Sequence, residues 1–210
     1  MDKYAYISIY ALTLAVGLYS FKKYNHNLHL KLWLYFLVYS FITEIIGVYL
    51  IYFVHLSANI LYNTWWLANS IFYMFFFLGK IELPIKKKLL IGLVSIFVIY
   101  NIISTLFYRN YQNEIFVDSF ILGQLFVVLT IMLYYTELLK SNAILNINQS
   151  LFFWISIGAL IFNIGMLPVF VIAEFIDWQG IFNYIILGLN IILSLCFITG
   201  FIVSKKEYNT

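Results

Sequence analysis

The stretch IFNYIILGLNIILSLCFITGFIV, residues 181–203, contains no charged side chain. A helix of about 20 residues rises about 30 Å, which matches the hydrocarbon core of a lipid bilayer. Six further apolar stretches of similar length precede it in the chain. Together they predict seven membrane-spanning helices, at residues 4–20, 32–54, 60–79, 89–108, 115–136, 151–173 and 181–203.

The composition requires lipid as the main solvent of the side chains. Of the 210 residues, 64% are hydrophobic and 10% are charged, and the mean hydropathy is +0.94. An ordinary soluble domain has about 25% charged residues. We therefore expect an all-α membrane protein that forms one transmembrane domain over residues 1–210, with no soluble domain. Its first partner is the bilayer, and the net charge of +3 gives no reason to expect nucleic acid.

The basic residues predict the orientation, because Lys and Arg concentrate in cytoplasmic loops. Only Lys3 and Arg109 fall on the side of the N-terminus. The ten on the opposite side are Lys22, Lys23, Lys31, Lys80, Lys86, Lys87, Lys88, Lys140, Lys205 and Lys206. This pattern predicts an external N-terminus, a cytoplasmic C-terminus and a place in a bacterial inner membrane. Trp33, Trp154 and Trp178 fall near the predicted interfaces, where tryptophan rings anchor helices.

Glu44 is the one acid expected deep in the membrane, about 18 Å into the second stretch. An acid at such depth costs a few kcal/mol and usually faces the protein interior. No Lys or Arg lies deep in any predicted span. The carboxyl therefore carries a proton, accepts hydrogen bonds from neighbouring helices, or binds a proton, metal cation or cationic ligand from outside the chain. Ser40 and Thr43 are its polar neighbours on the same helix.

Uncharged polar and aromatic residues recur at helical spacing in most of the other spans. Each set falls on one face of its helix, and such residues need partners in hydrocarbon. Two interpretations stay open: an amphipathic pocket with Glu44 as its charged member, or hydrogen bonds that tie the helices together. The candidate residues are Tyr62, Trp66, Asn69, Tyr73, Asn101, Gln124, Asn163, Asn183 and Asn190.

The sequence predicts no catalytic residue, no cofactor and no metal centre. It contains no HExxH, GxSxG or P-loop motif, and its last span has no lysine that could bind retinal. Asn63 and Asn69 in the third span loosely mirror Asn183 and Asn190 in the seventh. This similarity is compatible with a 3+1+3 arrangement of parallel repeats, as in some small transporters.

Four short motifs resemble uncharacterised seven-span inner-membrane proteins of AT-rich Gram-negative bacteria. They are Thr43-Glu44-Ile45-Ile46, Leu61-Tyr62-Asn63, Phe152-Phe153-Trp154-Ile155 and Leu189-Asn190-Ile191-Ile192. The resemblance covers most of the chain and implies the seven-span architecture. It implies no activity.

The leading functional hypothesis is a receptor-like sensor whose intramembrane pocket binds a small or amphipathic ligand. Its signal would pass to a membrane or cytoplasmic partner. The alternatives are a small secondary transporter that uses Glu44 for proton or cation coupling, an intramembrane enzyme acting on lipid, and an accessory membrane subunit.

Overall fold

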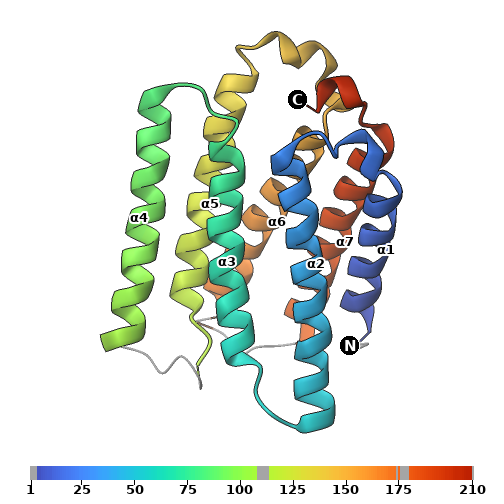
Figure 1. The fold of residues 1–210 in the computed structure, drawn as a ribbon. Coiled ribbons are helices and arrows are strands. Elements are labelled where there is room, and N and C mark those ends of the chain that lie inside the picture. The colour runs from blue at the N-terminus through green and yellow to red at the C-terminus, as the bar shows by residue number, and fades with distance from the viewer. Residues whose placement is uncertain (1–3, 108–113, 174, 176–179, 210) are drawn as a thin grey trace. The chain divides into compact units, whose positions relative to one another are not determined.

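The computed structural model describes residues 4–107, 114–173, 175 and 180–209 (Figure 1). The described residues are 86% helical and include no strand. The predicted apolar stretches form the α-helices α1 (Ala5–Tyr19), α2 (Leu28–Tyr49), α3 (Asn59–Leu78), α4 (Pro84–Phe107), α5 (Val117–Leu138), α6 (Leu151–Ala173) and α7 (Gly180–Val203). A π-helical segment, η2 (Leu50–Val54), continues α2, and the short 3₁₀ segments are η1 (Phe21–Lys23), η3 (Asn142–Gln149) and η4 (Lys206–Tyr208).

Within the described residues, five helical segments are long and apolar enough to cross a membrane. They are Leu28–Val54, Pro84–Phe107, Val117–Leu138, Leu151–Ile172 and Gly180–Val203. The apolar helix α1 has 15 residues, which is shorter than a usual span. In α3, the polar side chains of Asn63, Thr64, Asn69 and Ser70 lower the hydropathy. The fold is compatible with a multi-pass integral membrane protein.

Two predicted helix starts are wrong by about one turn. The second helix begins at Leu28, not at residue 32, and the fourth begins at Pro84, not at residue 89. Proline suits the first turn of a helix, because its missing N–H would have no partner there. Lys86, Lys87 and Lys88 consequently lie in the first turns of α4 rather than in a loop.

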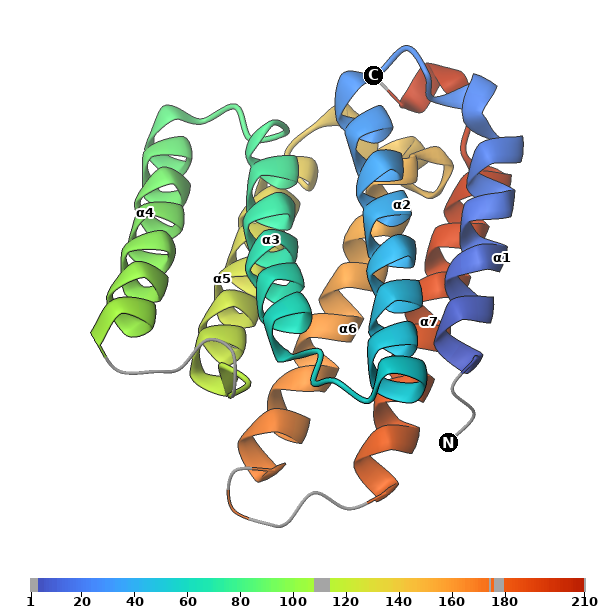
Figure 2. The ribbon, with the colours of Figure 1, turned by 60° about the horizontal axis from the view of Figure 1, so that its bottom comes forward.

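The chain divides into two compact units, Met1–Glu44 with Leu138–Thr210, and Ile45–Glu137. In the first unit, α7 packs along both α6 and α1 (Figures 1 and 2). Small residues allow this close approach. A Cβ atom on Gly165 would lie 2.5 Å from Leu189 Cδ2, and one on Gly17 would lie 2.8 Å from Phe201 Cζ.

The aromatic core of the first unit contains Trp33, which is 0% exposed. Its ring packs against Phe197 at 4.7 Å and Phe201 at 5.4 Å between centroids. The prediction that Trp33 anchors an interface is therefore wrong. Trp154 is half-buried and donates its indole N–H to the Asn148 carbonyl at 2.8 Å. Trp178 lies outside the described residues, as do Lys3 and Arg109.

Polar contacts join the chain segments at one end of the first unit. The Lys23 ammonium donates to the carbonyls of Phe201 and Ile202, at 3.1 and 2.7 Å, and so caps the C-terminus of α7. Asn209 is 0% exposed. Its Oδ1 accepts from the Leu151 N–H at 2.8 Å, and its Nδ2 donates to the Lys23 carbonyl at 3.4 Å. The last described residue thus caps α6 and holds η1.

The hydroxyl of Tyr24 tightens the turn between α1 and α2. It donates to the Gly17 carbonyl at 2.5 Å, and its ring lies 5.6 Å from that of Phe201. Burial raises the pKa of Tyr24 above its usual value. The hydroxyl therefore stays a hydrogen-bond donor at physiological pH.

In the second unit, α3 and α5 run parallel and are joined by two aromatic pairs. The ring of Trp66 packs on Phe120 at 4.3 Å, and that of Phe77 on Tyr134 at 5.3 Å. Between these pairs, Ser70 and Phe97 occupy the space where Gly123 would carry a Cβ atom. The three helices α3, α4 and α5 therefore meet most closely at Gly123.

Glu137 at the end of α5 holds the start of α4. Its carboxylate accepts from the backbone N–H groups of Glu82 and Leu83, at 2.6 and 3.1 Å. It also lies 3.4 Å from the Lys86 ammonium, which donates to Thr136 Oγ1 at 2.7 Å. An acid at a helix N-terminus pairs its orphan N–H groups and favours its dipole.

We predict that Asn209→Ala lowers the free energy of unfolding of the purified protein by about 1–2 kcal/mol. The substitution leaves the Leu151 N–H buried without its helix cap. Thermal unfolding in mild detergent measures the effect. Glu207→Ala is the matched control, because Glu207 is exposed on the neighbouring η4. Equal thermal unfolding midpoints for the two variants would contradict the role of Asn209 as the cap of α6.

Candidate functional site

Most polar side chains inside the helices donate to their own backbone. The acceptor is the carbonyl four residues earlier, which is a common arrangement for hydroxyl side chains in apolar helices. The distances run from 2.6 to 3.0 Å for Thr13, Ser40, Thr43, Asn101, Thr130, Asn163 and Asn190. Each hydroxyl proton is therefore satisfied within its helix, whereas each asparagine uses one of its two N–H groups in this way.

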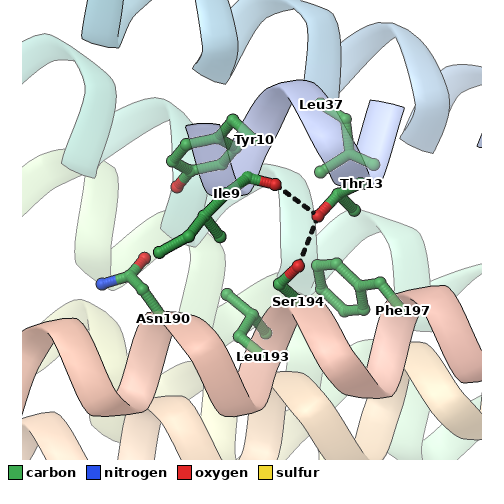
Figure 3. Close-up of a pocket in the computed structure, with 8 residues that line it drawn as sticks. All are labelled: Ile9, Tyr10, Thr13, Leu37, Asn190, Leu193, Ser194 and Phe197. Carbon is green, nitrogen blue, oxygen red and sulfur yellow. Dashed lines mark hydrogen bonds between the residues drawn. The ribbon is translucent and has the colours of Figure 1, made fainter. Parts of the chain in front are cut away.

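A small pocket lies between α1, α2 and α7 in the first unit (Figure 3). Its lining residues are Ile9, Tyr10, Thr13, Leu37, Asn190, Leu193, Ser194 and Phe197. The volume open to the centre of a water-sized sphere is about 10 Å³. That is room for about one water molecule or one ion, and far less than a metabolite needs.

The polar groups of this pocket come from α1 and α7. Thr13 Oγ1 lies 2.6 Å from Ser194 Oγ, which joins the two helices. The hydroxyl of Tyr10 and the side-chain amide of Asn190 lie together at the other end of the pocket (Figure 3). Asn190 is 8% exposed.

Glu44 of α2 lies near the first half of α1. Its carboxyl is within electrostatic range of the Tyr6 hydroxyl. Glu44 is half-buried and has neither a hydrogen bond nor an ion pair among the described residues.

Helix geometry relates Glu44 to the pocket. Thr13 pairs with Ser194 near the middle of α7, and Leu37 of α2 lines the same pocket. Tyr6 lies two turns from Thr13 toward the start of α1. Glu44 lies seven residues beyond Leu37, which is about 10 Å along α2.

A seam of polar groups thus follows α1 in the first unit. It passes from Glu44 and Tyr6 to Tyr10 and Asn190, and then to Thr13 and Ser194. Toward the C-terminal end of α7, the seam is closed by the packed rings of Phe197, Phe201 and Trp33. We refer to these six polar residues as the α1 seam.

The second unit has its own buried polar groups, near the start of α3 and α5. Asn63 donates to the Glu114 carbonyl at 2.7 Å and accepts from the Phe116 N–H at 3.0 Å. Ser119 donates to Asn101 Oδ1 at 2.5 Å and links α5 to α4. These contacts order the segment before α5.

Gln124 is the exception in the second unit. The side chain is 1% exposed, and neither Oε1 nor Nε2 has a hydrogen-bond partner within the described residues. A buried amide without partners costs about 1–3 kcal/mol. Its neighbour Gly123 lies in the tightest part of the unit, so Gln124 is held by packing and not by polar contacts.

The structure divides the predicted site residues between the two units. Glu44, Ser40, Thr43, Asn163, Asn183 and Asn190 belong to the first, and Tyr62, Trp66, Asn69, Tyr73, Asn101 and Gln124 to the second. Of the predicted set, the α1 seam contains Glu44 and Asn190. Ser40, Thr43 and Asn163 are buried, and each donates to its own helix.

The predicted aromatic residues of α3 have packing roles. Trp66 packs on Phe120, and Tyr73 stacks with Phe77 at 6.4 Å between centroids. The Tyr62 hydroxyl occupies the space next to Gly47, where any Cβ atom would collide with it. Asn69 is buried, and Asn183 is half-buried.

Three seam residues were not predicted from the sequence: Tyr6, Tyr10 and Thr13. They follow one another at spacings of four and three residues in the first apolar stretch. This spacing places them on one helix face and could have been recognised. The position of Ser194 was predictable, because it follows Asn190 by four residues and shares its helix face.

The fold is that of a helical protein with several apolar, membrane-length helices. Comparison with known proteins found no matching family model, no similar curated protein and no similar solved structure. No group of three or more His, Cys, Asp or Glu side chains that could hold a metal ion occurs in the described part of the chain.

We predict that Gln124→Met leaves the protein as stable as the wild type or raises its unfolding midpoint. Methionine has a similar length and removes two unpaired polar atoms, and replacing unsatisfied groups by apolar atoms is often neutral or stabilising. Asn101→Met, which breaks two hydrogen bonds, is the contrasting variant and should lower the midpoint. If Gln124→Met is as destabilising as Asn101→Met, the amide has partners that this structure does not contain.

Proposed function

We propose that the chain is a seven-span protein of a bacterial inner membrane, with its N-terminus outside. The distribution of lysines within each unit supports this orientation. In the first unit, Lys23 contacts the end of α7, and the Lys205 N–H donates to the Gln149 carbonyl at 3.0 Å. In the second unit, Lys80 and Lys86 flank the turn between α3 and α4. Burial within the protein lowers the pKa of the Lys80 ammonium below its usual value.

Within that architecture, we propose a receptor-like protein that binds a small cationic ligand at the outer part of the α1 seam. The observation that carries this proposal is the half-buried carboxyl of Glu44, which has no ionic partner in the described part of the chain. A buried carboxylate is stabilised strongly by a bound positive charge. The ligand would supply the positive charge that no side chain provides to Glu44 in the described part of the chain.

The surroundings of Glu44 favour an organic ammonium group. Tyr6 lies within electrostatic range of the carboxyl, and Tyr10 follows one turn later on the same face of α1. Aromatic faces attract ammonium groups, most strongly where water is excluded. A small alkylammonium would place its charge at Glu44 and its methyl groups against the rings. The packed rings of Trp33, Phe197 and Phe201 further along α1 favour binding over passage through the unit.

Secondary transport is the second candidate, and the same carboxyl favours it. Glu44 would then bind a proton or cation on one side of the membrane and release it on the other. Reconstituted vesicles distinguish the two functions. A transporter accumulates labelled ligand inside the vesicle, whereas a receptor binds it without net flux and passes the signal to a partner.

Reporter fusions test the proposed topology. We expect alkaline phosphatase to be active when fused after Ser57, because the turn between α2 and α3 would be external. Green fluorescent protein should fluoresce when fused after Asn25 or Glu82, because both turns would be cytoplasmic. The opposite pattern of activity would overturn the orientation.

Substitution of Glu44 tests the proposed ligand. We predict that tetramethylammonium and its longer alkyl analogues raise the unfolding midpoint of the wild type in mild detergent. Glu44→Gln should weaken this binding at least tenfold, because the amide keeps the shape and removes the charge. Glu207→Gln, at an exposed position, should bind like the wild type. Equal binding by Glu44→Gln and the wild type would refute a charged site.

A further inference from the structure

Four lysines gather at the end of the first unit where α1 and α7 both finish. Lys22 and Lys23 lie in η1, directly after α1, and Lys205 and Lys206 follow α7. Asn209 joins the two segments, because its Nδ2 donates to the Lys23 carbonyl at 3.4 Å and its backbone N–H donates to the Lys206 carbonyl at 3.3 Å. Figures 1 and 2 show η4 beside the turn between α1 and α2. We refer to these four lysines as the lysine cluster.

The positive charge of the lysine cluster is not balanced within the first unit. Lys22, Lys205 and Lys206 are exposed, and none of their ammonium groups forms an ion pair or a hydrogen bond within the described residues. In the described part of this unit the acids are Glu44 and Glu207. Glu44 lies toward the other end of α2, so Glu207 is left to offset the four lysines. The cluster therefore presents an excess of positive charge to an anionic group.

Exposed apolar side chains lie directly before the lysines on both helices. Leu18 and Tyr19 end α1, and Ile202 and Val203 end α7. Tyr19 is 93% exposed, and Leu18 and Ile202 are 59% and 61% exposed. Because α1 packs along α7, both apolar helix ends lie next to the lysine cluster. Tyrosine at the end of a membrane helix is typical of the level of the lipid headgroups.

We propose that the lysine cluster binds the phosphate headgroup of an anionic phospholipid, whose acyl chains lie along the ends of α1 and α7. Lysine clusters directly after membrane helices attract anionic headgroups. A phospholipid matches both parts of this surface, because one molecule carries the negative charge and the apolar chains. An acidic protein segment would pair with the lysines and leave Leu18, Tyr19 and Ile202 uncovered. The proposal rests on the proposed membrane topology, but not on ligand binding at Glu44.

A bound headgroup would bridge two segments that the fold already joins. Lys22 belongs to η1 and Lys206 to η4, so one phosphate between them would hold the tail of the chain in place. The tail carries Asn209, which caps the start of α6 through the Leu151 N–H. A ligand that binds only the folded form stabilises that form by mass action. The stability of the first unit would then depend on the anionic lipid present.

Lipid-dependent unfolding tests the site. The purified protein is heated in mild detergent with added phosphatidylglycerol, or with phosphatidylcholine of the same acyl chains. We expect phosphatidylglycerol to give a saturable rise of the unfolding midpoint above that with phosphatidylcholine. Lys22→Gln combined with Lys206→Gln should weaken phosphatidylglycerol binding about tenfold or more, because each segment loses one positive charge. The matched control combines Lys87→Gln with Lys88→Gln, two exposed positions of α4 in the second unit, and should respond like the wild type.

An equal response of the wild type to the two lipids would overturn the proposal. An equal loss in the two double variants would do the same, because net charge alone would then explain the binding. Soluble glycerol phosphate and polyglutamate are tested in parallel. If either raises the midpoint as much as phosphatidylglycerol does, the lysine cluster binds a free phosphate or an acidic protein segment, and the lipid site is refuted. Tetramethylammonium binding that persists in the Lys22→Gln and Lys206→Gln variant separates this site from the one at Glu44.

Discussion

The whole structure depends on how polar side chains are satisfied where water is scarce. In hydrocarbon, each unpaired donor or acceptor costs free energy, so backbone groups close their hydrogen bonds within helices. The buried Thr, Ser and Asn side chains follow the same rule, because they donate to carbonyls of their own helix. Thr13, Asn101 and Asn190 all do so. This local pairing uses the hydroxyl protons and one N–H of each amide, and it leaves side-chain oxygens as acceptors for neighbouring groups.

The two units use the remaining oxygens differently. In the second unit, Asn101 Oδ1 accepts from Ser119, and Asn63 Oδ1 accepts from the backbone before α5, so the oxygens hold segments together. In the first unit, Ser194 Oγ pairs with Thr13 Oγ1 and joins α7 to α1, while the Glu44 carboxyl lies within electrostatic range of Tyr6 on α1. A half-buried acid with no basic partner in the described residues is suited to an added positive charge.

Much of the fold could be predicted from the sequence, because long apolar stretches allow few alternatives in lipid. The helices lie close to the expected bounds. The starts of α2 and α4 were placed about one turn too late, because charged side chains continue each helix beyond its apolar part. Lysines extend along the surface there, so hydropathy alone does not reveal the first turn. Trp33 was misplaced for a related reason: its position near a span end suggested an interface, but neighbouring rings of α7 cover it.

The candidate site was less predictable, since it depends on which helices are neighbours. Glu44 and Asn190 could be selected as buried polar residues, but nothing in the sequence indicated that α1 lies between them. The capping contacts of Asn209 and Glu137 also join residues distant in the chain. The account as a whole is tested most directly by an experimental structure in a lipid nanodisc. With tetramethylammonium added, it predicts ligand density at the Glu44 carboxyl, on the side that faces Tyr6 and Tyr10. Glu44 turned toward lipid headgroups, with no ligand density beside it, would contradict it.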